Sequence, residues 1–328
     1  MTVQVTIIGL GQIGASMGLA LAKHKDQLTV SGHDIEFGIA RKAQQMGAID
    51  KAEINLPNSV RNADLVVLAL PIKGVIETLE IILPDLRENV VIMDTAPIKS
   101  EIMDWARANL PANRHYVGLV PAINPAYLRQ PGSGQDAAHA DLFEKGLMGI
   151  ISLPGTPGDA IKLASDFTRL LGASPLFMDP AEADGLMSMA HILPQLMAAA
   201  LTQATVDEPG WVEMRKLAGQ PYAMAAGQVE KEDFLNGLPA AISKNRENTL
   251  RVLNRYLQEL ITLRDLLSQG EEAPLNEYLS QAQAGYLTWV SERGRGDWTA
   301  KELAQEQAPS FGTMMKRLLV GERPAKKK

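Results

Sequence analysis

Three glycines near the start of the chain have the spacing that cradles the phosphates of a dinucleotide. Gly9, Gly11 and Gly14 form a G-x-G-x-x-G pattern, which follows the apolar run 3–8 and precedes a helix-favouring stretch, 15–23. In that order, the first glycine permits a tight turn, the second lets a pyrophosphate approach the backbone, and the third lets helix and strand pack closely. The N–H groups at the start of the helix then bind the phosphates. The pattern therefore predicts a strand, a phosphate-binding turn and a helix.

An acidic residue supports this interpretation. Asp34 follows a second apolar run, 28–32, and lies twenty residues after Gly14. A carboxylate there accepts hydrogen bonds from the ribose hydroxyls of NAD and repels the 2′-phosphate of NADP. Arg41 is close enough in sequence to bind such a phosphate, so NADP stays open as an alternative. We predict NAD as the cofactor; ordinary loop glycines with a solvated aspartate are the alternative.

The composition narrows the class of protein. The chain has 328 residues, a net charge of −6 and no cysteine. That length is enough for two domains, and the charge gives no indication of a nucleic-acid partner. No basic leader with an apolar stretch, no apolar run of membrane-spanning length and no metal-ligand cluster is visible. We expect a cytoplasmic enzyme that acts on a small molecule, without a disulfide, a bound metal or contact with a membrane.

Strand and helix signals alternate along the first 180 residues. Apolar, β-rich runs alternate with helical stretches that end at glycines such as Gly47 and Gly172. This alternation predicts an α/β fold, a Rossmann-like doubly wound parallel sheet, for an NAD-binding domain at 1–180. We expect the strands at 3–8, 28–32, 65–70, 90–94, 116–121, 149–153 and 175–178.

The carboxyl ends of these strands should bind the cofactor, because ligands of doubly wound sheets lie there. The segments that follow the strands are thus expected to converge on one site. The predicted cofactor-binding residues are Gly9, Leu10, Gly11, Gln12, Ile13, Gly14, Asp34, Leu70, Pro71 and Thr95.

A loop-like stretch, 122–140, follows the fifth strand. It is rich in turn-forming pairs such as Pro131-Gly132. A long irregular segment beside an active site is often a lid or a substrate loop, and a flexible surface insertion is the alternative. Asn124 and Tyr127 begin this stretch, and we predict that they form hydrogen bonds with the substrate.

Strand signals cease after residue 180, and the remainder, 181–328, predicts an all-helical dimerisation and substrate domain. The stretch 182–206 is apolar on nearly every side, which is typical of a buried helix. The stretch 243–268 carries leucines at the three- and four-residue spacing that is typical of a helix packed against a partner helix. A third helix is expected at 275–291. We predict a two-fold homodimer through these helices, with packing inside one chain as the alternative. The leucines are Leu250, Leu253, Leu257, Leu260 and Leu267.

The chain resembles the prephenate dehydrogenase family, which includes the arogenate dehydrogenases, along nearly its whole length. The opening 9–16, the strand 63–71 and the segment Ala140-Asp-Leu-Phe-Glu144 are similar to motifs of that family. The segment Ala190-His-Ile-Leu-Pro194 looks like its Ser-His-Leu-Pro helix, and 246–268 resembles its dimer-forming helix. The resemblance implies a nucleotide-binding domain followed by a helical dimerisation domain. It also implies oxidative decarboxylation of a cyclohexadienol, in which a base takes the hydroxyl proton while hydride passes to NAD.

Three positions depart from the family pattern. Val120 stands where the resemblance places the histidine that takes the proton, and Pro97 stands where the Asp-x-Gly-Ser-x-Lys segment has serine. The stretch 219–227 matches the family's Phe-Arg-Asp segment but contains no arginine. Losing a positioned base costs about 10²–10⁴-fold in rate, and a dianionic substrate such as prephenate would lose a bidentate partner. These changes indicate a changed substrate or lost catalysis.

Two residues are candidates for the missing chemistry. His191 should lie early in the apolar helix and face the cleft between the domains, where it would act as the base; a buried, hydrogen-bonded histidine is the alternative. Lys99 should meet the nicotinamide ribose or a substrate anion; a surface lysine is the alternative. We predict an NAD-dependent oxidoreductase of this family that acts on a substrate other than prephenate. A true prephenate or arogenate dehydrogenase of tyrosine biosynthesis with a substitute base, and a catalytically silent NAD(H)-binding dimer, stay as alternatives.

Overall fold

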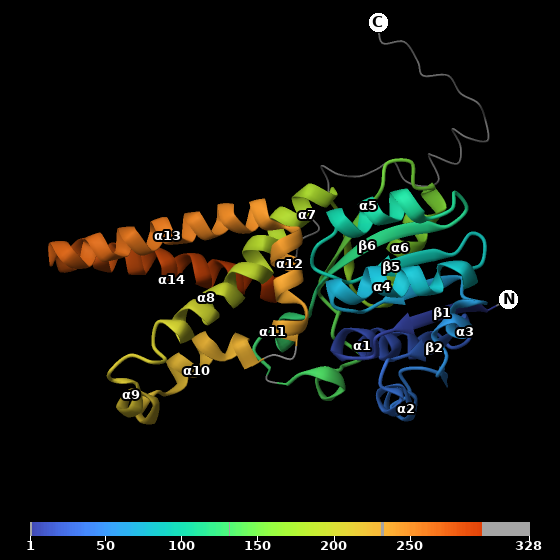
Figure 1. The fold of residues 1–328 in the computed structure, drawn as a ribbon, viewed down its shortest axis with the longest axis horizontal. Coiled ribbons are helices and arrows are strands. Elements are labelled where there is room, and N and C mark those ends of the chain that lie inside the picture. Colours follow the sequence, from blue (N-terminus) through green and yellow to red (C-terminus); the bar gives the residue numbers. More distant parts are fainter. Residues whose placement is uncertain (1, 131, 231–232, 297–328) are drawn as a thin grey trace, which may run out of the picture. The chain divides into compact units, whose positions relative to one another are not determined.

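A computed structural model describes residues 2–130, 132–230 and 233–296 of the chain (Figure 1). The chain contacts divide it into two compact units, Met1–Tyr278 and Leu279–Lys328. The sheet, the phosphate-binding turn and every predicted site residue belong to the first unit. The part of the predicted helical domain beyond residue 296 lies outside the described residues.

An eight-stranded sheet forms the nucleotide fold, with strand order β3-β2-β1-β4-β5-β6-β7-β8. Every neighbouring pair is parallel except β6 and β7, which run antiparallel. The order reverses between β1 and β4, as expected for a doubly wound sheet, and the predicted fold class is confirmed. The strands are β1 Val3–Ile8, β2 Leu28–His33, β3 Lys51–Ala52, β4 Leu65–Leu68, β5 Val91–Asp94, β6 His115–Ala122, β7 Leu147–Ser152 and β8 Ser174–Phe177.

The antiparallel pair departs from the wholly parallel sheet that we predicted. In the described residues between β6 and β7, the regular structure consists of two short 3₁₀ turns, Pro125–Tyr127 and Gly134–Ala137. A parallel return needs a crossover connection, usually a helix, whereas an antiparallel strand can return at the same end of the sheet. The two-residue strand β3 was also not predicted, because it is too short to produce a pattern.

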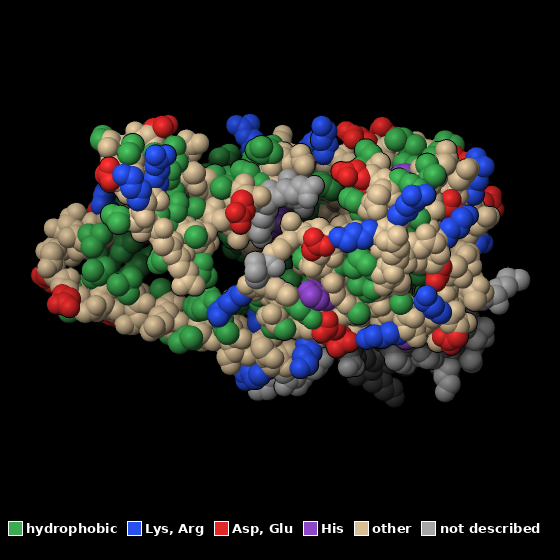
Figure 2. Space-filling view, turned by 90° about the horizontal axis from the view of Figure 1, so that it is seen from below, with side chains coloured by type: hydrophobic (Ala, Val, Ile, Leu, Met, Phe, Trp, Pro, Cys, Tyr) green, Lys and Arg blue, Asp and Glu red, His purple; other side chains and the backbone are tan. Residues whose placement is uncertain are grey.

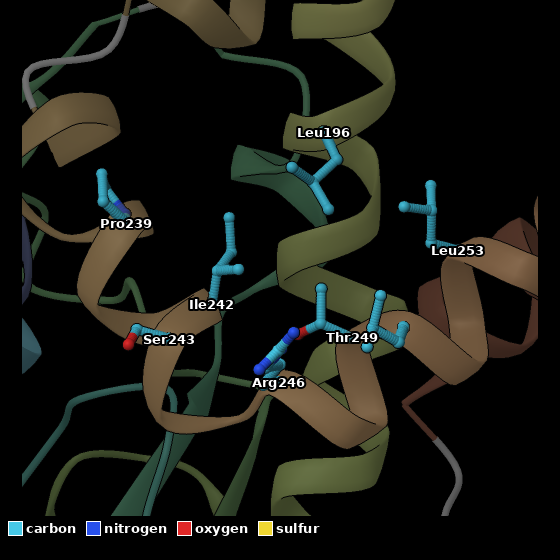
Figure 3. A pocket seen from close by; sticks show the side chains of 8 residues that line it. Leu196, Pro239, Ile242, Ser243, Arg246, Thr249 and Leu253 are labelled. Carbon is cyan, nitrogen blue, oxygen red and sulfur yellow. The ribbon is translucent and has the colours of Figure 1, made fainter.

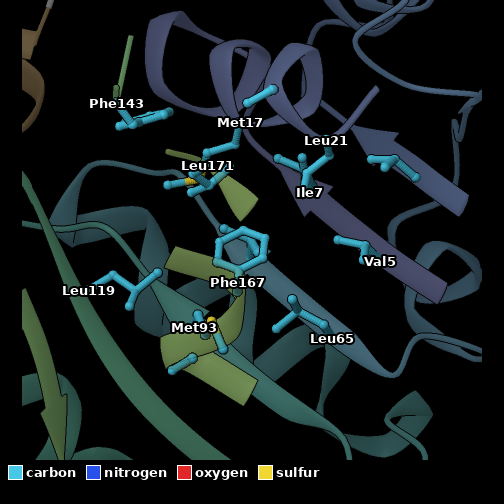
Figure 4. Packing of buried hydrophobic residues seen from close by; sticks show 14 of the residues in the cluster. Val5, Ile7, Met17, Leu21, Leu65, Met93, Leu119, Phe143, Phe167 and Leu171 are labelled. Atoms are coloured by element: carbon cyan, nitrogen blue, oxygen red, sulfur yellow. The ribbon is translucent and has the colours of Figure 1, made fainter. Parts of the chain in front are cut away.

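Helices cover both faces of the sheet. One face packs against α1 (Gln12–Leu21), α2 (Phe37–Gln45) and α6 (Gly158–Leu170), and Figure 4 shows its core. The other face packs against α3 (Leu56–Val60), α4 (Ile72–Ile82) and α5 (Ser100–Asn109). Successive strand residues divide between the two cores: Ile7 lies in the first and Ile8 in the second. This two-sided burial explains why the central strands are apolar along their whole length.

The apolar helix after the sheet is interrupted by a π-helical turn. It consists of α7 (Pro180–Met187), the π turn Ser188–Ile192 and α8 (Leu193–Gln203). Pro194 has no N–H and its ring clashes with a regular helical carbonyl, which favours a wider turn just before it. The amide of Leu193 accordingly donates to the carbonyl of Ser188, five residues back.

This helical run, Pro180–Gln203, is long and apolar enough to cross a membrane by length and composition. That finding contradicts the expectation that no apolar run reaches such a length. Only 22% of its most apolar window is buried by the rest of the chain, so the prediction of a buried helix is not met within one copy. The run still makes protein contacts: α8 packs against α10, and the π turn packs against α12 and α13.

Further helices follow this run along the chain. The predicted helices at 243–268 and 275–291 correspond to α13 and α14, with shifted ends. Gly270, which has a φ of 71°, ends α13 in a left-handed C-cap. The proposed domain boundary at residue 180 stays a prediction, although the last strand ends at Phe177. The helices are α9 Trp211–Leu217, α10 Gln220–Ala226, α11 Asp233–Asn236, α12 Leu238–Lys244, α13 Arg246–Gln269 and α14 Glu272–Arg295.

Candidate functional site

The glycine turn between β1 and α1 leaves one open surface. Gly9 has a φ of 86°, and a Cβ there would overlap the Ala69 carbonyl oxygen. A Cβ at Gly14 would overlap the Gly9 carbonyl oxygen, so this position requires glycine for close packing. A Cβ at Gly11 would have no atom within 4 Å. The space above Gly11 is therefore where a pyrophosphate can approach the backbone, as the pattern predicts.

The first turn of α1 is suited to bind an anion. Gly11 is the N-cap of α1, and no side chain caps this end of the helix. The N–H groups at such a helix start, together with the positive end of the helix dipole, attract phosphate. The Gln12 Nε2 donates to the Ala137 carbonyl at 3.1 Å, so its side chain is directed at the β6–β7 loop.

Asp34 is placed where its predicted role requires. Its two carboxylate oxygens accept the N–H groups of Leu10 at 2.8 Å and Glu36 at 3.0 Å. The half-buried carboxylate thus joins the glycine turn to the end of β2 and keeps lone pairs for ribose hydroxyls. Arg41 stacks on the Phe37 ring, with its guanidinium carbon 5.1 Å from the ring centre. This arrangement favours NAD over NADP.

The other predicted cofactor residues border the same turn. Leu70 lies against Gly9, because its Cδ2 would be 2.8 Å from a Cβ at that position. Pro71 is the N-cap of α4. The amide of Thr95 donates to the Leu68 carbonyl at 3.0 Å, which joins the ends of β4 and β5. The structure therefore places these residues at the carboxyl ends of neighbouring strands.

Lys99 is completely buried and forms an ion pair. Its Nζ donates to the Asp94 carboxylate at 2.7 Å and to the Asp94 carbonyl at 3.1 Å, and both residues are 0% exposed. The Tyr116 hydroxyl donates to the other oxygen of the same carboxylate. Burial lowers the pKa of Lys99, and burial beside Asp94 raises the pKa of Tyr116 well above its ordinary value. Lys99 is neither the surface lysine of the alternative nor directed at open space, and its catalytic role stays a prediction.

Sequence reasoning missed this Asp-Lys-Tyr cluster. One pattern in the sequence could have indicated burial: Ala96 and Ile98, in the loop before Lys99, are apolar, and both are buried in the structure. Gly118 could be connected with Lys99 only in the structure, where a Cβ at Gly118 would be 2.8 Å from the Lys99 Cδ. The glycine of β6 therefore makes room for the lysine chain.

His191 lies in the π turn with an exposed side chain. Its carbonyl accepts the Gln195 Nε2 at 2.9 Å, and Gln195 is the buried residue, at 8% exposed. The predicted family segment has four residues where this chain has five, and a π turn absorbs one additional residue in a helix. Within this one chain Gln195 is the buried polar side chain and His191 is exposed. The role of His191 as a base stays a prediction.

Asn124 and Tyr127 are bonded within the β6–β7 loop. The Tyr127 hydroxyl donates to the Asp141 carboxylate at 2.6 Å, and this hydrogen bond raises the pKa of Tyr127. Asn124 Nδ2 donates to the Asp141 carbonyl at 3.1 Å. The ring of His139 stacks on Tyr127 at 4.3 Å. Contact of Asn124 or Tyr127 with a substrate stays a prediction.

The end of the predicted loop 122–140 is fixed to the nucleotide fold. Gln135 and Ala137 are buried, and the Gln135 Nε2 donates to the Ile39 carbonyl at 2.8 Å. The amide of His139 donates to the Ser16 hydroxyl of α1 at 3.0 Å. A function as a lid or substrate loop stays a prediction, with a surface insertion as its alternative.

The three positions that differ from the family pattern also differ in their burial. Val120 is half-buried and packs against the same apolar cluster as Met178 and Met187. Pro97 is half-buried in the loop after β5, and Ala223, in α10, is exposed.

None of the predicted site residues lines a cavity of about 490 Å³ in the helical part of the chain. It is formed by α8, α12 and α13 and is largely apolar (Figure 3). Its volume is within the range of small-molecule pockets. Its lining residues are Leu196, Pro239, Ile242, Ser243, Arg246, Thr249, Leu250 and Leu253.

The doubly wound sheet with this turn and Asp34 defines a dinucleotide-binding oxidoreductase fold. The family model described as "Prephenate dehydrogenase, nucleotide-binding domain" matches residues 17–175, which end within β8. The cyclohexadienyl dehydrogenase of Zymomonas mobilis is 25% identical over 285 residues, covering 86% of this chain and 94% of that protein. The prephenate dehydrogenase of Bacillus subtilis is also 25% identical, covering 85% and 74% respectively. The nucleotide-binding part of the chain is similar to the prephenate dehydrogenase family, and the named relatives indicate an NAD-dependent dehydrogenase of that type.

Solved structures share the fold. The Aquifex aeolicus prephenate dehydrogenase, solved with hydroxyphenyl propionate and NAD+, matches with a TM-score of 0.75 and 20% identity, covering 88% of this chain and 98% of that one. The Synechocystis arogenate dehydrogenase matches with a TM-score of 0.68 and 22% identity, covering 87% and 99%. The predictions of the family, of a dehydrogenase and of NAD as its cofactor agree with these comparisons.

Proposed function

We propose that this dehydrogenase oxidises or reduces a substrate other than prephenate. The observation that carries the proposal is the setting of Val120, which stands where the family resemblance places the proton-accepting histidine. Val120 itself packs against a hydrophobic cluster on one face of the sheet. The glycine turn and Asp34, by contrast, keep the geometry for a dinucleotide. The cofactor half of the site is thus intact beside a substrate half without the usual base.

The charge of the site supports a less anionic substrate. The stretch 219–227, which matches the family's Phe-Arg-Asp segment, contains no cationic side chain. A dianion needs a fixed guanidinium because ionised oxygens are costly to desolvate without a charged partner. Pro97 removes a further hydroxyl from the loop after β5. A substrate with one carboxylate, or with none, suits these residues better than prephenate.

Two other functions stay as candidates. Relatives named prephenate dehydrogenase and cyclohexadienyl dehydrogenase align with 85% and 86% of this chain, which favours tyrosine biosynthesis with His191 or water as a substitute base. A silent NAD(H)-binding dimer is favoured by the complete cofactor turn beside Val120.

The test is NADH formation from NAD with prephenate and with arogenate, beside an NADH-binding titration of the same protein. No turnover with intact NADH binding leaves the changed substrate and the silent dimer. A screen of hydroxy acids, ketones and imines then separates these two, because only an enzyme oxidises or reduces one of the compounds. Turnover of prephenate or arogenate at rates of about 1–10³ s⁻¹, typical of enzymes, would refute the proposal. His191→Ala then shows whether the substitute base is His191 or a water molecule. The substitution abolishes turnover only if the imidazole takes the proton.

We further propose that two copies of the chain form a homodimer through the helices that follow residue 180, among them α13. Four of the five predicted leucines of α13 are exposed, by 43–60% of their surface. The fifth, Leu253, lines the cavity together with Leu250, so the apolar face continues into a recess. Figure 2 shows hydrophobic side chains on the surface of the molecule, seen from one side. An exposed stripe of this kind is typical of a covered interface.

Sedimentation equilibrium tests the dimer. Leu257→Glu places a charge in the stripe and should yield a monomer, whereas Gln258→Glu, one residue along the same helix, should leave the dimer intact. Wild-type protein that sediments as a monomer at micromolar concentration would contradict the proposal.

We also propose a cytoplasmic location, where NAD(H) is available. The apolar run Pro180–Gln203 would then be covered by the second copy of the chain. Recovery of the protein in the membrane fraction would contradict this location.

A further inference from the structure

A buried carboxylate that none of the predicted roles uses lies between the sheet and the helical segment. Asp184, in α7, is 4% exposed. Its carboxylate accepts the backbone N–H groups of Lys99 at 2.6 Å and of Ser100 at 3.1 Å. These two groups begin α5, which has no side-chain cap from its own N-cap residue. We propose that Asp184 is a positioning residue for the Thr95–Lys99 segment, which follows β5 at the cofactor-binding edge of the sheet.

The charge of Asp184 suits this position. A carboxylate at a helix start is stabilised by the N–H groups and by the helix dipole. Its negative charge also acts on the buried ammonium of Lys99 and opposes the effect of burial on the pKa of that lysine. Hydrogen bonds to an ionised acceptor contribute more than neutral ones. Asp184 therefore fixes both the backbone and the charge of the residue that ends the segment.

The backbone of Asp184 is fixed in turn by the helical segment. Its carbonyl accepts the Asn245 Nδ2 at 2.8 Å and the Ser188 hydroxyl at 2.9 Å. The same Asn245 Nδ2 donates to the Ser188 oxygen at 2.7 Å. Ser188 begins the π turn, and Asn245 joins α12 to α13. One continuous buried network thus connects the start of α13 to the start of α5.

The position of the Thr95–Lys99 segment matters for the cofactor. The Thr95 amide is bonded to Leu68, so the segment begins beside the turn that holds Leu70 and Gly9. Ligands of such sheets lie beyond these strand ends. The inference rests on the proposed use of NAD(H): if the segment contacts the cofactor, releasing its far end should weaken binding.

The experiment compares two aspartates that each accept a backbone N–H. Asp184→Asn removes the charge at the cofactor edge. Asp64→Asn is the matched control, because its carboxylate accepts the Gln4 amide at 2.8 Å but precedes β4 at the opposite edge. Both substitutions should lower the melting temperature. Only Asp184→Asn should raise the NADH dissociation constant, by about tenfold, the effect of losing one charged hydrogen bond.

The readout is NADH fluorescence in the full-length protein, at a temperature well below both melting points. Asn245→Ala is a milder second variant, which keeps the carboxylate and should raise the dissociation constant about threefold; it replaces Asp184→Asn if that variant does not fold. A folded Asp184→Asn protein with the NADH affinity of the wild type would overturn this inference and leave the proposed function standing. The same result in Asn245→Ala would do so if Asp184→Asn does not fold. Absence of NADH binding by the wild type would overturn the proposed function, and this inference with it.

Discussion

The buried Asp94–Lys99 pair gives the sharpest prediction of stability. Lys99→Met keeps the length of the side chain and its contact with Gly118 but removes the ammonium group. The Asp94 carboxylate would then stay buried, with only the Tyr116 hydroxyl and the Ala96 amide as partners. Removing one partner of a buried ion pair typically costs about 3–5 kcal/mol. Because domains are stable by only about 5–15 kcal/mol, the variant should lose a large part of its stability.

Urea unfolding followed by circular dichroism measures this loss by linear extrapolation. The double variant Asp94→Asn with Lys99→Met removes both charges, and it should be more stable than Lys99→Met alone, since neutral replacement of a buried pair is often tolerated. The Lys162→Met variant is the control, because its pair with Asp166 is exposed and should contribute about 1 kcal/mol or less. A Lys99→Met protein within 1 kcal/mol of the wild type would refute the reasoning, and so would a double variant less stable than the single one.

Three further predictions concern the cofactor turn and the buried tyrosine. Gly11→Ala should keep the wild-type melting temperature, because its Cβ meets no atom within 4 Å, but should weaken NADH binding at least tenfold; unchanged binding would contradict the placement of the pyrophosphate. Asp34→Ser should lower the affinity of the protein for NADH and reduce the ratio of its affinities for NADH and NADPH. Titration of the variant with both cofactors tests this. The folded-state pKa of Tyr116 is raised above the ordinary 10.0, so its contribution to stability is present below pH 10 and is lost as the pH rises further. Tyr116→Phe should flatten this loss in urea unfolding between pH 9.5 and 11, and an unchanged slope would contradict it.

The cofactor turn could be predicted because its signals are local. Gly9 and Gly14 are required by backbone contacts within a few residues or with one neighbouring strand. Asp34 follows β2 directly, so its distance from Leu10 is set by the pairing of β1 and β2. Such features repeat wherever a strand, a turn and a helix occur in this order.

The interior of the site could not be predicted in the same way. Lys99 is buried because Gly118, on the next strand, leaves room for it and Asp94 neutralises it, and both contacts depend on sheet order. Asp184 lies 85 positions after Lys99 in sequence and contacts it only through the docking of α7. A lysine or aspartate in a single sequence carries no sign of such a partner.

The π turn shows a different failure, that of an assumed geometry. The apolar helix was predicted from its composition, but the π turn just before Pro194 was not. The wider turn leaves His191 exposed and Gln195 buried, although they are four residues apart. Proline in a helix was the available signal, because it removes a hydrogen bond and forces a local change of pitch.

The surroundings of Val120 bear on the choice between a changed substrate and a recent loss of catalysis. A histidine deleted from a working site would leave its former partners unpaired, and an unpaired buried polar atom costs about 1–3 kcal/mol. In the described residues of the nucleotide fold, the buried side-chain atoms without a hydrogen bond belong to Arg114, His139 and Thr168. Val120 packs against a cluster of hydrophobic residues. An aliphatic side chain suits these surroundings, which favours a change of substrate or of role over a prephenate site that keeps the usual base.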